Sequence, residues 1–261
     1  MLREFLIRFF TYAFDGGSGP TSYSDGLGEG AFGWRHFLWI GFVVLAAVLG
    51  SFYFRKRPKA ERTFVTIFAI SLFAFRLVHQ TVRASIGVEV PWTQAFPFHM
   101  CTVLTFLLPL TIVFDWKAIK TPVYVLSIMG GVITVILGDY FDNRFLTMFA
   151  LEGMSAHTLL ILIPIYEFAA GRHRLELRDA WRVIAGILVL MGWATLANLV
   201  FYPDSGANYM YLMENALPFG TDKNYFLFYI LIFLVFFAGI YAGPIARALR
   251  RRKTTTAAAH R

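Results

Sequence analysis

The sequence predicts an all-α membrane protein, a bundle of seven transmembrane helices with its N-terminus outside and its C-terminus in the cytoplasm. Three observations lead to this fold class. The chain is 57% hydrophobic and only 15% charged, whereas soluble domains carry about 25% charged residues. Seven apolar stretches are each close to the ~20 residues that cross ~30 Å of hydrocarbon. Lysine and arginine gather in every second loop, as expected for a polytopic membrane protein.

The first 35 residues precede the spans. Leu2 and Phe9 share one face of a short helix, and Arg3 and Arg8 lie on the opposite face. This amphipathic pattern predicts an interfacial helix, which lies on the membrane and does not cross it. A tether rich in glycine and serine then leads to the first span.

The membrane domain is expected over residues 36–249, and residues 250–261 are expected to form a basic, disordered tail. Each predicted span is too long for a strand and ends where charged or turn-forming residues begin. The spans are predicted at residues 36–54, 63–82, 96–114, 121–138, 155–170, 181–201 and 225–246.

Basic residues predict the orientation. Most of them follow spans one, three, five and seven, for example Arg55, Lys56 and Arg57 after span one. Because lysine and arginine are retained on the cytoplasmic side, the N-terminus is predicted outside. The net charge of +8 then favours contact with anionic lipids of the inner leaflet, and no nucleic acid partner is expected.

Unusual polar residues gather near the outer ends of the predicted spans, whereas the inner halves are almost purely aliphatic and aromatic. An ionisable side chain inside a membrane is costly and normally faces protein or water. Polar groups from several helices at one depth therefore predict a water-accessible cavity, open to the outer leaflet. A hydrogen-bond network that only holds the bundle together is the alternative. The candidate residues are His36, Arg76, His79, His99, Cys101, His157, Asn198, Asn208 and Tyr211.

Cys101, the one cysteine of the chain, is the candidate nucleophile. Pro97 is favoured at the first position of a helix. A helix that starts there carries the Cys101 thiol in its second turn, near the positive end of the helix dipole. A neutral imidazole beside a thiol acts as general base in acyl transfer. His157 is predicted at matching depth on another helix, whereas His99 is two residues away and points to a different helix face. The alternative is an inert buried cysteine.

Three segments carry a resemblance to a known family. They are Pro97-Phe98-His99-Met100-Cys101, the Ser155-Ala156-His157 start of span five, and Asn198 with the later run from Gly206 to Leu212. Together they resemble the YwaF-like bacterial membrane proteins, which are similar to the eukaryotic transmembrane protein 164 family. A more distant resemblance runs to the androgen-induced membrane hydrolases. The sequence departs from the family pattern at Thr102, where an aspartate usually follows the cysteine.

This resemblance implies a lipid acyltransferase or lipid ester hydrolase in the bacterial plasma membrane. It assigns Cys101 as nucleophile and His157 as general base, with Asn198, Asn208 and Tyr211 lining the site. The implied substrate is a membrane lipid, and no cofactor or metal is expected.

Two further functions stay open. Several histidines could converge on a zinc ion, because three histidines and a water make a catalytic zinc site; Glu152 is then expected nearby in an outer loop. The other function is a non-enzymatic receptor, transporter or assembly factor with a ligand-binding cavity. The sequence leaves the lipid, the acyl acceptor and the oligomeric state open.

Overall fold

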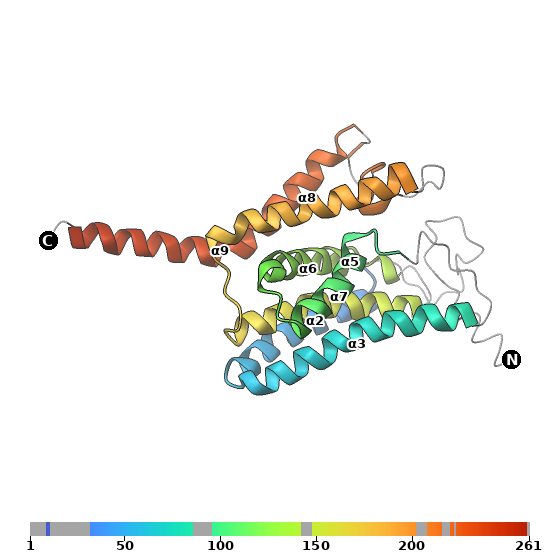
Figure 1. Ribbon diagram of the computed structural model, residues 1–261, viewed down its shortest axis with the longest axis horizontal. Helices are drawn as coiled ribbons and strands as arrows, with labels where there is room; N and C mark the ends of the chain where they lie inside the picture. Colours follow the sequence, from blue (N-terminus) through green and yellow to red (C-terminus); the bar gives the residue numbers. More distant parts are fainter. Residues whose placement is uncertain are drawn as a thin grey trace. The chain divides into compact units, whose positions relative to one another are not determined.

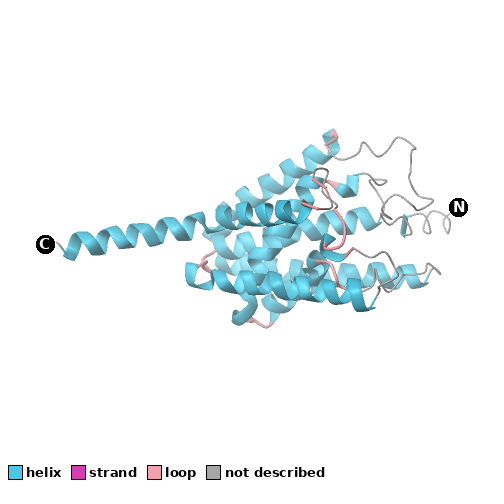
Figure 2. Cartoon of the chain, turned by 90° about the horizontal axis from the view of Figure 1, so that it is seen from above, coloured by secondary structure: helices cyan, strands magenta, loops and turns pink. Residues whose placement is uncertain are grey.

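The computed structural model describes residues 9–10, 32–85, 96–141, 148–201, 208–215, 220–221 and 223–259. All regular secondary structure in these residues is helical, which confirms the all-α prediction for the described chain (Figures 1 and 2). The predicted N-terminal interfacial helix and its tether lie almost entirely outside the described residues.

The described chain contains long helices joined by short helical turns. The long helices are α2 (Trp34–Arg55), α3 (Pro58–Ser85), α5 (Met100–Val113), α6 (Lys117–Leu137), α7 (Met148–Ala169), α8 (Ala180–Leu196) and α9 (Tyr225–Ala259). The short turns are η1 (Asp139–Phe141), η2 (Leu177–Asp179), η3 (Ala197–Phe201) and η4 (Tyr209–Tyr211).

Six of the described helical stretches are long and apolar enough to cross a membrane, and α5 is not among them. With 14 residues, α5 is about 21 Å long at 1.5 Å per residue, which is less than the ~30 Å of hydrocarbon. The chain is therefore a helical membrane protein, while the seventh span and the orientation stay predictions. At the C-terminal end, α9 continues as a helix to Ala259, through most of the segment expected to be a disordered tail.

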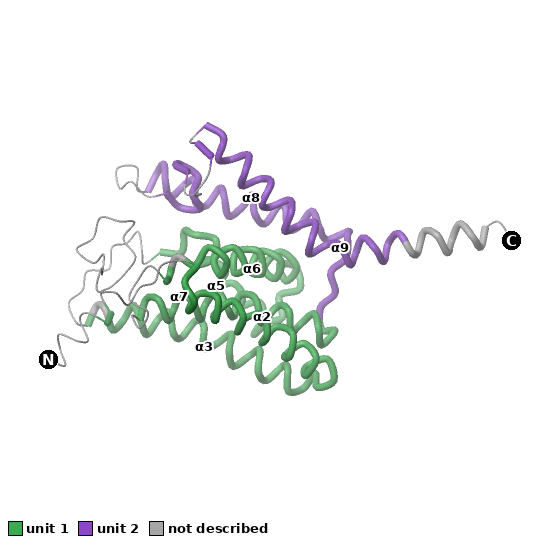
Figure 3. The backbone as a smooth tube through the Cα atoms, turned by 180° about the vertical axis from the view of Figure 1, so that it is seen from behind, with its two compact units in different colours: residues 1–172 green, residues 173–261 purple. Residues whose placement is uncertain are grey.

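The chain divides into two compact units, residues 1–172 and residues 173–261, which are coloured separately in Figure 3. In unit 1, α7 lies against α2, α3, α5 and α6. The membrane-crossing stretch of α7 is 72% buried, whereas that of α2 is 11% buried. Helix α7 is therefore the centre of unit 1, and α2 presents most of its apolar side chains outward, as a lipid-facing helix does.

A buried stripe on α5 completes this core. Leu104, Leu108 and Ile112 follow one another at intervals of four residues and are almost fully buried. Side chains at this spacing share one helix face. Leu160 and Ile163 supply buried side chains from α7.

Two adjacent glycines bring α6 close to its neighbours. A Cβ atom on Gly130 would lie 2.9 Å from the Cys101 sulfur, and one on Gly131 would lie 2.8 Å from the His157 carbonyl oxygen. The absence of side chains at these two positions therefore lets α6 pack tightly against both α5 and α7, as small residues do in membrane bundles. This close packing occurs beside Cys101 and His157.

His36 joins the start of α2 to the end of α6. Its Nε2 donates to the Val135 carbonyl oxygen at 2.7 Å, and its Nδ1 accepts the Phe32 backbone N–H at 2.9 Å. The ring packs where a Cβ atom on Gly138 would clash with it. Gly138 also ends α6 in the left-handed conformation, with φ of 71°, which glycine adopts readily.

A second cluster of charged residues lies at the opposite end of unit 1 from the predicted site. Glu61 and Glu167 have no exposed surface. Arg172 Nε lies 3.4 Å from a Glu61 carboxylate oxygen and 3.5 Å from a Glu167 oxygen. Lys120 Nζ lies 3.2 Å from Glu167 and 3.1 Å from Asp115. We call these five residues the ionic lock, because their contacts join α3, α6 and the end of α7.

The ionic lock corrects the expectation that this end of the bundle is purely aliphatic and aromatic. The predicted span over 121–138 begins one residue after Lys120 and so places this lysine in an exposed loop. In the structure, Lys120 is only 5% exposed. Glu167 and Glu152, at opposite ends of α7, are separated by about 22 Å at 1.5 Å per residue. Unit 1 therefore holds charged groups near both ends, with an apolar layer between them.

Candidate active site

The two residues predicted to carry the chemistry line the same cavity. This cavity has a volume of about 50 Å³ and lies between α3, α5, η1 and α7. Cys101 enters it from α5 and His157 from α7, and threonines of α5 form part of its wall. The complete lining is Arg76, Cys101, Thr102, Thr105, Tyr140, Phe149, Glu152, Gly153, Ala156 and His157. We call it the cysteine cavity.

Cys101 lies in the first turn of its helix. Helix α5 begins at Met100, with His99 as the preceding N-cap residue, so the thiol is one turn closer to the helix start than the position of Pro97 predicted. The positive end of the helix dipole is therefore near the sulfur. The Thr134 side chain of α6 lies within hydrogen-bonding reach of the thiol.

The hydrogen bond of His157 selects one tautomer of its neutral imidazole ring. Nδ1 lies 2.7 Å from the Gly153 carbonyl oxygen, and because a carbonyl oxygen only accepts, Nδ1 carries the proton in this bond. In the neutral imidazole the other nitrogen, Nε2, is then an acceptor. This is the form that a general base requires. The Tyr140 ring, with its centroid 5.5 Å from that of His157, limits the movement of the imidazole.

A buried ionic group forms the wall of the cysteine cavity on the α3 side. Arg76 Nη1 donates to a Glu152 carboxylate oxygen at 2.9 Å, and His79 Nδ1 makes a short hydrogen bond to the other oxygen. The side chains of Glu152 and His79 are 8% and 1% exposed. Arg76 and Glu152 line the cavity, and His79 contacts Glu152 beside it.

Glu152 is the residue that the sequence prediction misplaced. The predicted span started at residue 155, which put Glu152 in an outer loop, but α7 starts at Met148 and carries Glu152 in its second turn. The apolar run Met148 to Leu151 before this glutamate was the available signal. An acidic residue inside an apolar stretch indicates a buried pair or a site.

The remaining histidines have separate surroundings. His36 is held by backbone groups of residues 32 and 135, and His99 stands at the N-cap of α5 and is not part of the wall of the cysteine cavity. Among the described residues, no three His, Cys, Asp or Glu side chains gather closely enough to hold a metal ion. The convergence of histidines that the zinc hypothesis requires is therefore not seen in the described chain.

Three predicted lining residues belong to unit 2, where two of them organise the turn between α8 and α9. Asn198 donates through Nδ2 to the Tyr209 carbonyl oxygen and accepts the Tyr209 N–H at 2.8 Å. Asn208 accepts the Met213 N–H through its side-chain oxygen at 2.9 Å. Tyr211 is exposed. The predicted role of these residues beside Cys101 stays a prediction.

The model of the TMEM164 family matches residues 31–241. This match covers well over half of the chain, including the helices α3, α5 and α7 that line the cysteine cavity and the turn between α8 and α9. No similar curated protein and no similar solved structure was found.

Proposed function

Because this chain belongs to the TMEM164 family, we propose that it is a membrane enzyme which cleaves or transfers an acyl chain of a lipid ester through Cys101. One observation carries the proposal. A thiol and an imidazole from two different helices line one small cavity, and the imidazole is hydrogen-bonded so that its neutral form has an acceptor at Nε2. These are the two groups that thiol-dependent acyl transfer needs.

In the proposed reaction, His157 Nε2 takes the proton of the Cys101 thiol. The sulfur attacks the ester carbonyl carbon, and the C–O bond to the lipid alcohol breaks. The alcohol leaves with the proton from His157, and the acyl chain remains on sulfur as a thioester. Water or the hydroxyl of a second lipid then attacks the thioester, and the thiol is restored.

The size of the cysteine cavity fits the reacting group and excludes the whole substrate. Pockets that enclose drug-sized ligands have volumes of roughly 300–1,000 Å³, whereas this cavity has about 50 Å³. We propose that only the ester group enters and that the acyl chains stay in the bilayer. Phe73 and Leu77, which flank Arg76 on α3, are exposed apolar residues against which such chains can lie.

Arg76 and Glu152 give the cysteine cavity its polar side. We propose that these two residues orient the polar part of the lipid near the ester, and that His79 holds Glu152 in place through its short hydrogen bond. In the orientation predicted from the basic loops, this end of the bundle faces the outer leaflet of a bacterial plasma membrane. The basic residues at the other face would then contact anionic inner-leaflet lipids.

The proposal is tested on purified protein in lipid nanodiscs, supplied with phospholipid that carries a labelled acyl chain. We expect mass spectrometry to find the label on Cys101, and expect Cys101→Ala and His157→Ala to abolish turnover. His173→Ala, which changes a histidine outside the cavity, is the control and should retain activity. An unlabelled Cys101 together with full turnover by Cys101→Ala contradicts the proposal. Preserved cellular function in a Cys101→Ser, His157→Ala double variant would instead favour a ligand-binding protein.

A further inference from the structure

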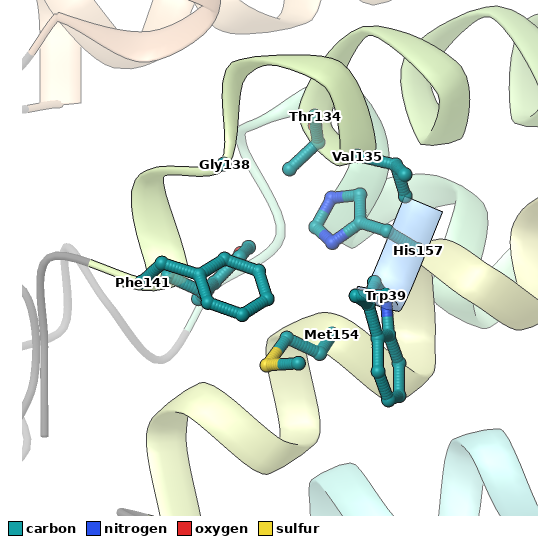
Figure 4. A pocket seen from close by; sticks show the side chains of 8 residues that line it. Trp39, Thr134, Val135, Gly138, Phe141, Met154 and His157 are labelled. Atoms are coloured by element: carbon teal, nitrogen blue, oxygen red, sulfur yellow. The ribbon is translucent and has the colours of Figure 1, made fainter. Parts of the chain in front are cut away.

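His157 borders a second, smaller cavity that the reaction described above does not use. This cavity has a volume of about 10 Å³ and lies between α2, the end of α6, η1 and α7. Figure 4 shows the His157 ring in it, with Thr134 on one side and Trp39 and Met154 on the other. Among the described residues, His157 and Tyr140 alone line both this cavity and the cysteine cavity, so the two cavities meet at these side chains. We call the smaller one the tryptophan cavity.

Trp39, which lines this cavity, carries an unused hydrogen-bond donor. Its indole nitrogen Nε1 is buried and has no hydrogen-bond partner among the described residues. A buried N–H group without an acceptor is unfavourable, and native proteins almost always provide one. Trp39 lines this cavity together with His157, the proposed general base. The indole N–H of Trp39 therefore requires an acceptor oxygen that the described residues do not supply.

The volume and the neighbouring groups define that acceptor. About 10 Å³ is the space of a single water-sized probe, and a buried water needs two to four polar partners. Trp39 Nε1 can donate to such a water, and Thr134 and His157 bring a hydroxyl and an imidazole to the same cavity. No larger ligand fits in this volume.

We propose that the tryptophan cavity binds one water molecule, which the Trp39 indole N–H holds and which hydrolyses the acyl thioester on Cys101. This inference rests on the proposed function. His157 Nε2 removes a proton from the water as its oxygen attacks the thioester carbonyl carbon. The C–S bond breaks, the fatty acid leaves, and the thiolate takes the proton from His157. A lipid alcohol reaches the thioester from the cysteine cavity, so the two acceptors approach the thioester from different cavities.

The experiment compares wild-type protein with Trp39→Phe in phosphatidylcholine nanodiscs. A p-nitrophenyl fatty ester acylates Cys101 in a burst of p-nitrophenolate, and the later steady rate reports loss of the acyl group. We expect Trp39→Phe to keep the burst rate and to lower the hydrolytic rate about five- to tenfold, the effect of one lost hydrogen bond. With lysophosphatidylcholine present, the ratio of transfer to hydrolysis should rise by the same factor. Trp34→Phe, which changes an exposed tryptophan, should alter neither rate.

The outcomes separate this inference from the proposed function. Two results in Trp39→Phe contradict the water site: hydrolysis and transfer that fall equally, or a slower burst. Either result would arise if Trp39 donated to the substrate carbonyl or if the substitution disturbed the fold. Unchanged hydrolysis in Trp39→Phe also contradicts the water site. Wild-type protein that shows no burst contradicts the proposed function. In that case the water site is tested by Raman spectroscopy. The difference spectrum of wild type minus Trp39→Phe isolates the N–H band of the Trp39 indole. A hydrogen-bonded band supports the site, and a band of a free N–H overturns it.

Discussion

At the scale of single residues, two glycines leave the space that the side chains of Cys101 and Tyr140 occupy. Gly130 leaves room for the Cys101 sulfur, and Gly153 has no side chain where the Tyr140 ring packs. The carbonyl oxygen of Gly153 also accepts the Nδ1 proton of His157. Small residues thus allow Cys101 and His157 to share one cavity, and their replacement should disturb the proposed site before it disturbs the fold.

We therefore expect Gly130→Ala to impair Cys101. The new Cβ atom would lie 2.8 Å from the flexible end of Met100 and 2.9 Å from the sulfur of Cys101. Met100 can move aside, but displacement of the sulfur should slow acylation roughly ten- to hundredfold, as misplaced reacting groups do. Acylation of Cys101 by the p-nitrophenyl ester measures this effect. Gly41→Ala, at a position with no heavy atom within 4 Å, is the matched control, and equal rates in both variants would refute the expectation.

Glu152 offers a second test at this scale. Glu152→Gln removes the negative charge that contacts both Arg76 and His79. We expect the free energy of unfolding to fall by up to about 3 kcal/mol, because breaking a buried ion pair is costly. Replacing Arg76 and Glu152 together by methionine should cost less than either single change. Thermal unfolding in detergent measures these differences, and additive losses in the double variant would show that the two residues do not act as a pair.

At the scale of helices, charge pairs hold both ends of unit 1. Arg76 and His79 join α3 to α7 at one end, and the ionic lock joins α3, α6 and α7 at the other. The sequence indicated only the first group, since the residues of the ionic lock lie near span ends and resemble loop charges. Their burial depends on how neighbouring helices are aligned along their lengths, which the sequence pattern does not specify.

Within the ionic lock, Lys120 makes one pair with the buried Glu167 and one with the exposed Asp115, and these two pairs should differ in strength. Lys120→Met leaves the fully buried Glu167 without its nearest cation, and we expect a loss of about 3 kcal/mol in the free energy of unfolding. Asp115→Asn breaks a pair whose carboxylate side chain is 49% exposed, so its loss should stay below about 1 kcal/mol. Urea or thermal unfolding in detergent distinguishes the two. Similar losses would show that burial does not set the strength of these contacts.

The Asp115 pair also has a defined pH dependence. The hydrogen bond from Lys120 lowers the pKa of the Asp115 carboxyl below its ordinary value. Its small contribution to stability is therefore complete above the ordinary pKa of aspartate and is lost as the pH falls through the lowered value. The stability difference between wild type and Asp115→Asn should narrow in acid, whereas a constant difference would indicate a role that is independent of charge.

At the scale of the whole molecule, orientation in the membrane is a separate prediction. The two ends of α3 provide matched positions for single-cysteine labelling in a Cys101→Ser background. With the N-terminus outside, Ser85→Cys should react with an impermeant maleimide on intact cells, and Lys59→Cys only after permeabilisation. Both residues are exposed, so accessibility depends on the side of the membrane. The reverse pattern would invert the orientation and place the cysteine cavity at the cytoplasmic face.

The sequence alone determined the apolar stretches and the family resemblance. Both are local properties: a span needs a certain hydrophobic length, and the resemblance depends on the runs of residues around Cys101 and His157. They gave a helical membrane protein, its family, and the two residues that share the cysteine cavity. Hydropathy does not fix where a helix ends, so the sequence pattern places Glu152 and Lys120 in loops. Only the tertiary structure decided their burial, the ring form of His157 and the place of Trp39 beside it. Each of these depends on a contact between helices that are distant in the chain, and spacing within one helix carries no information about such contacts.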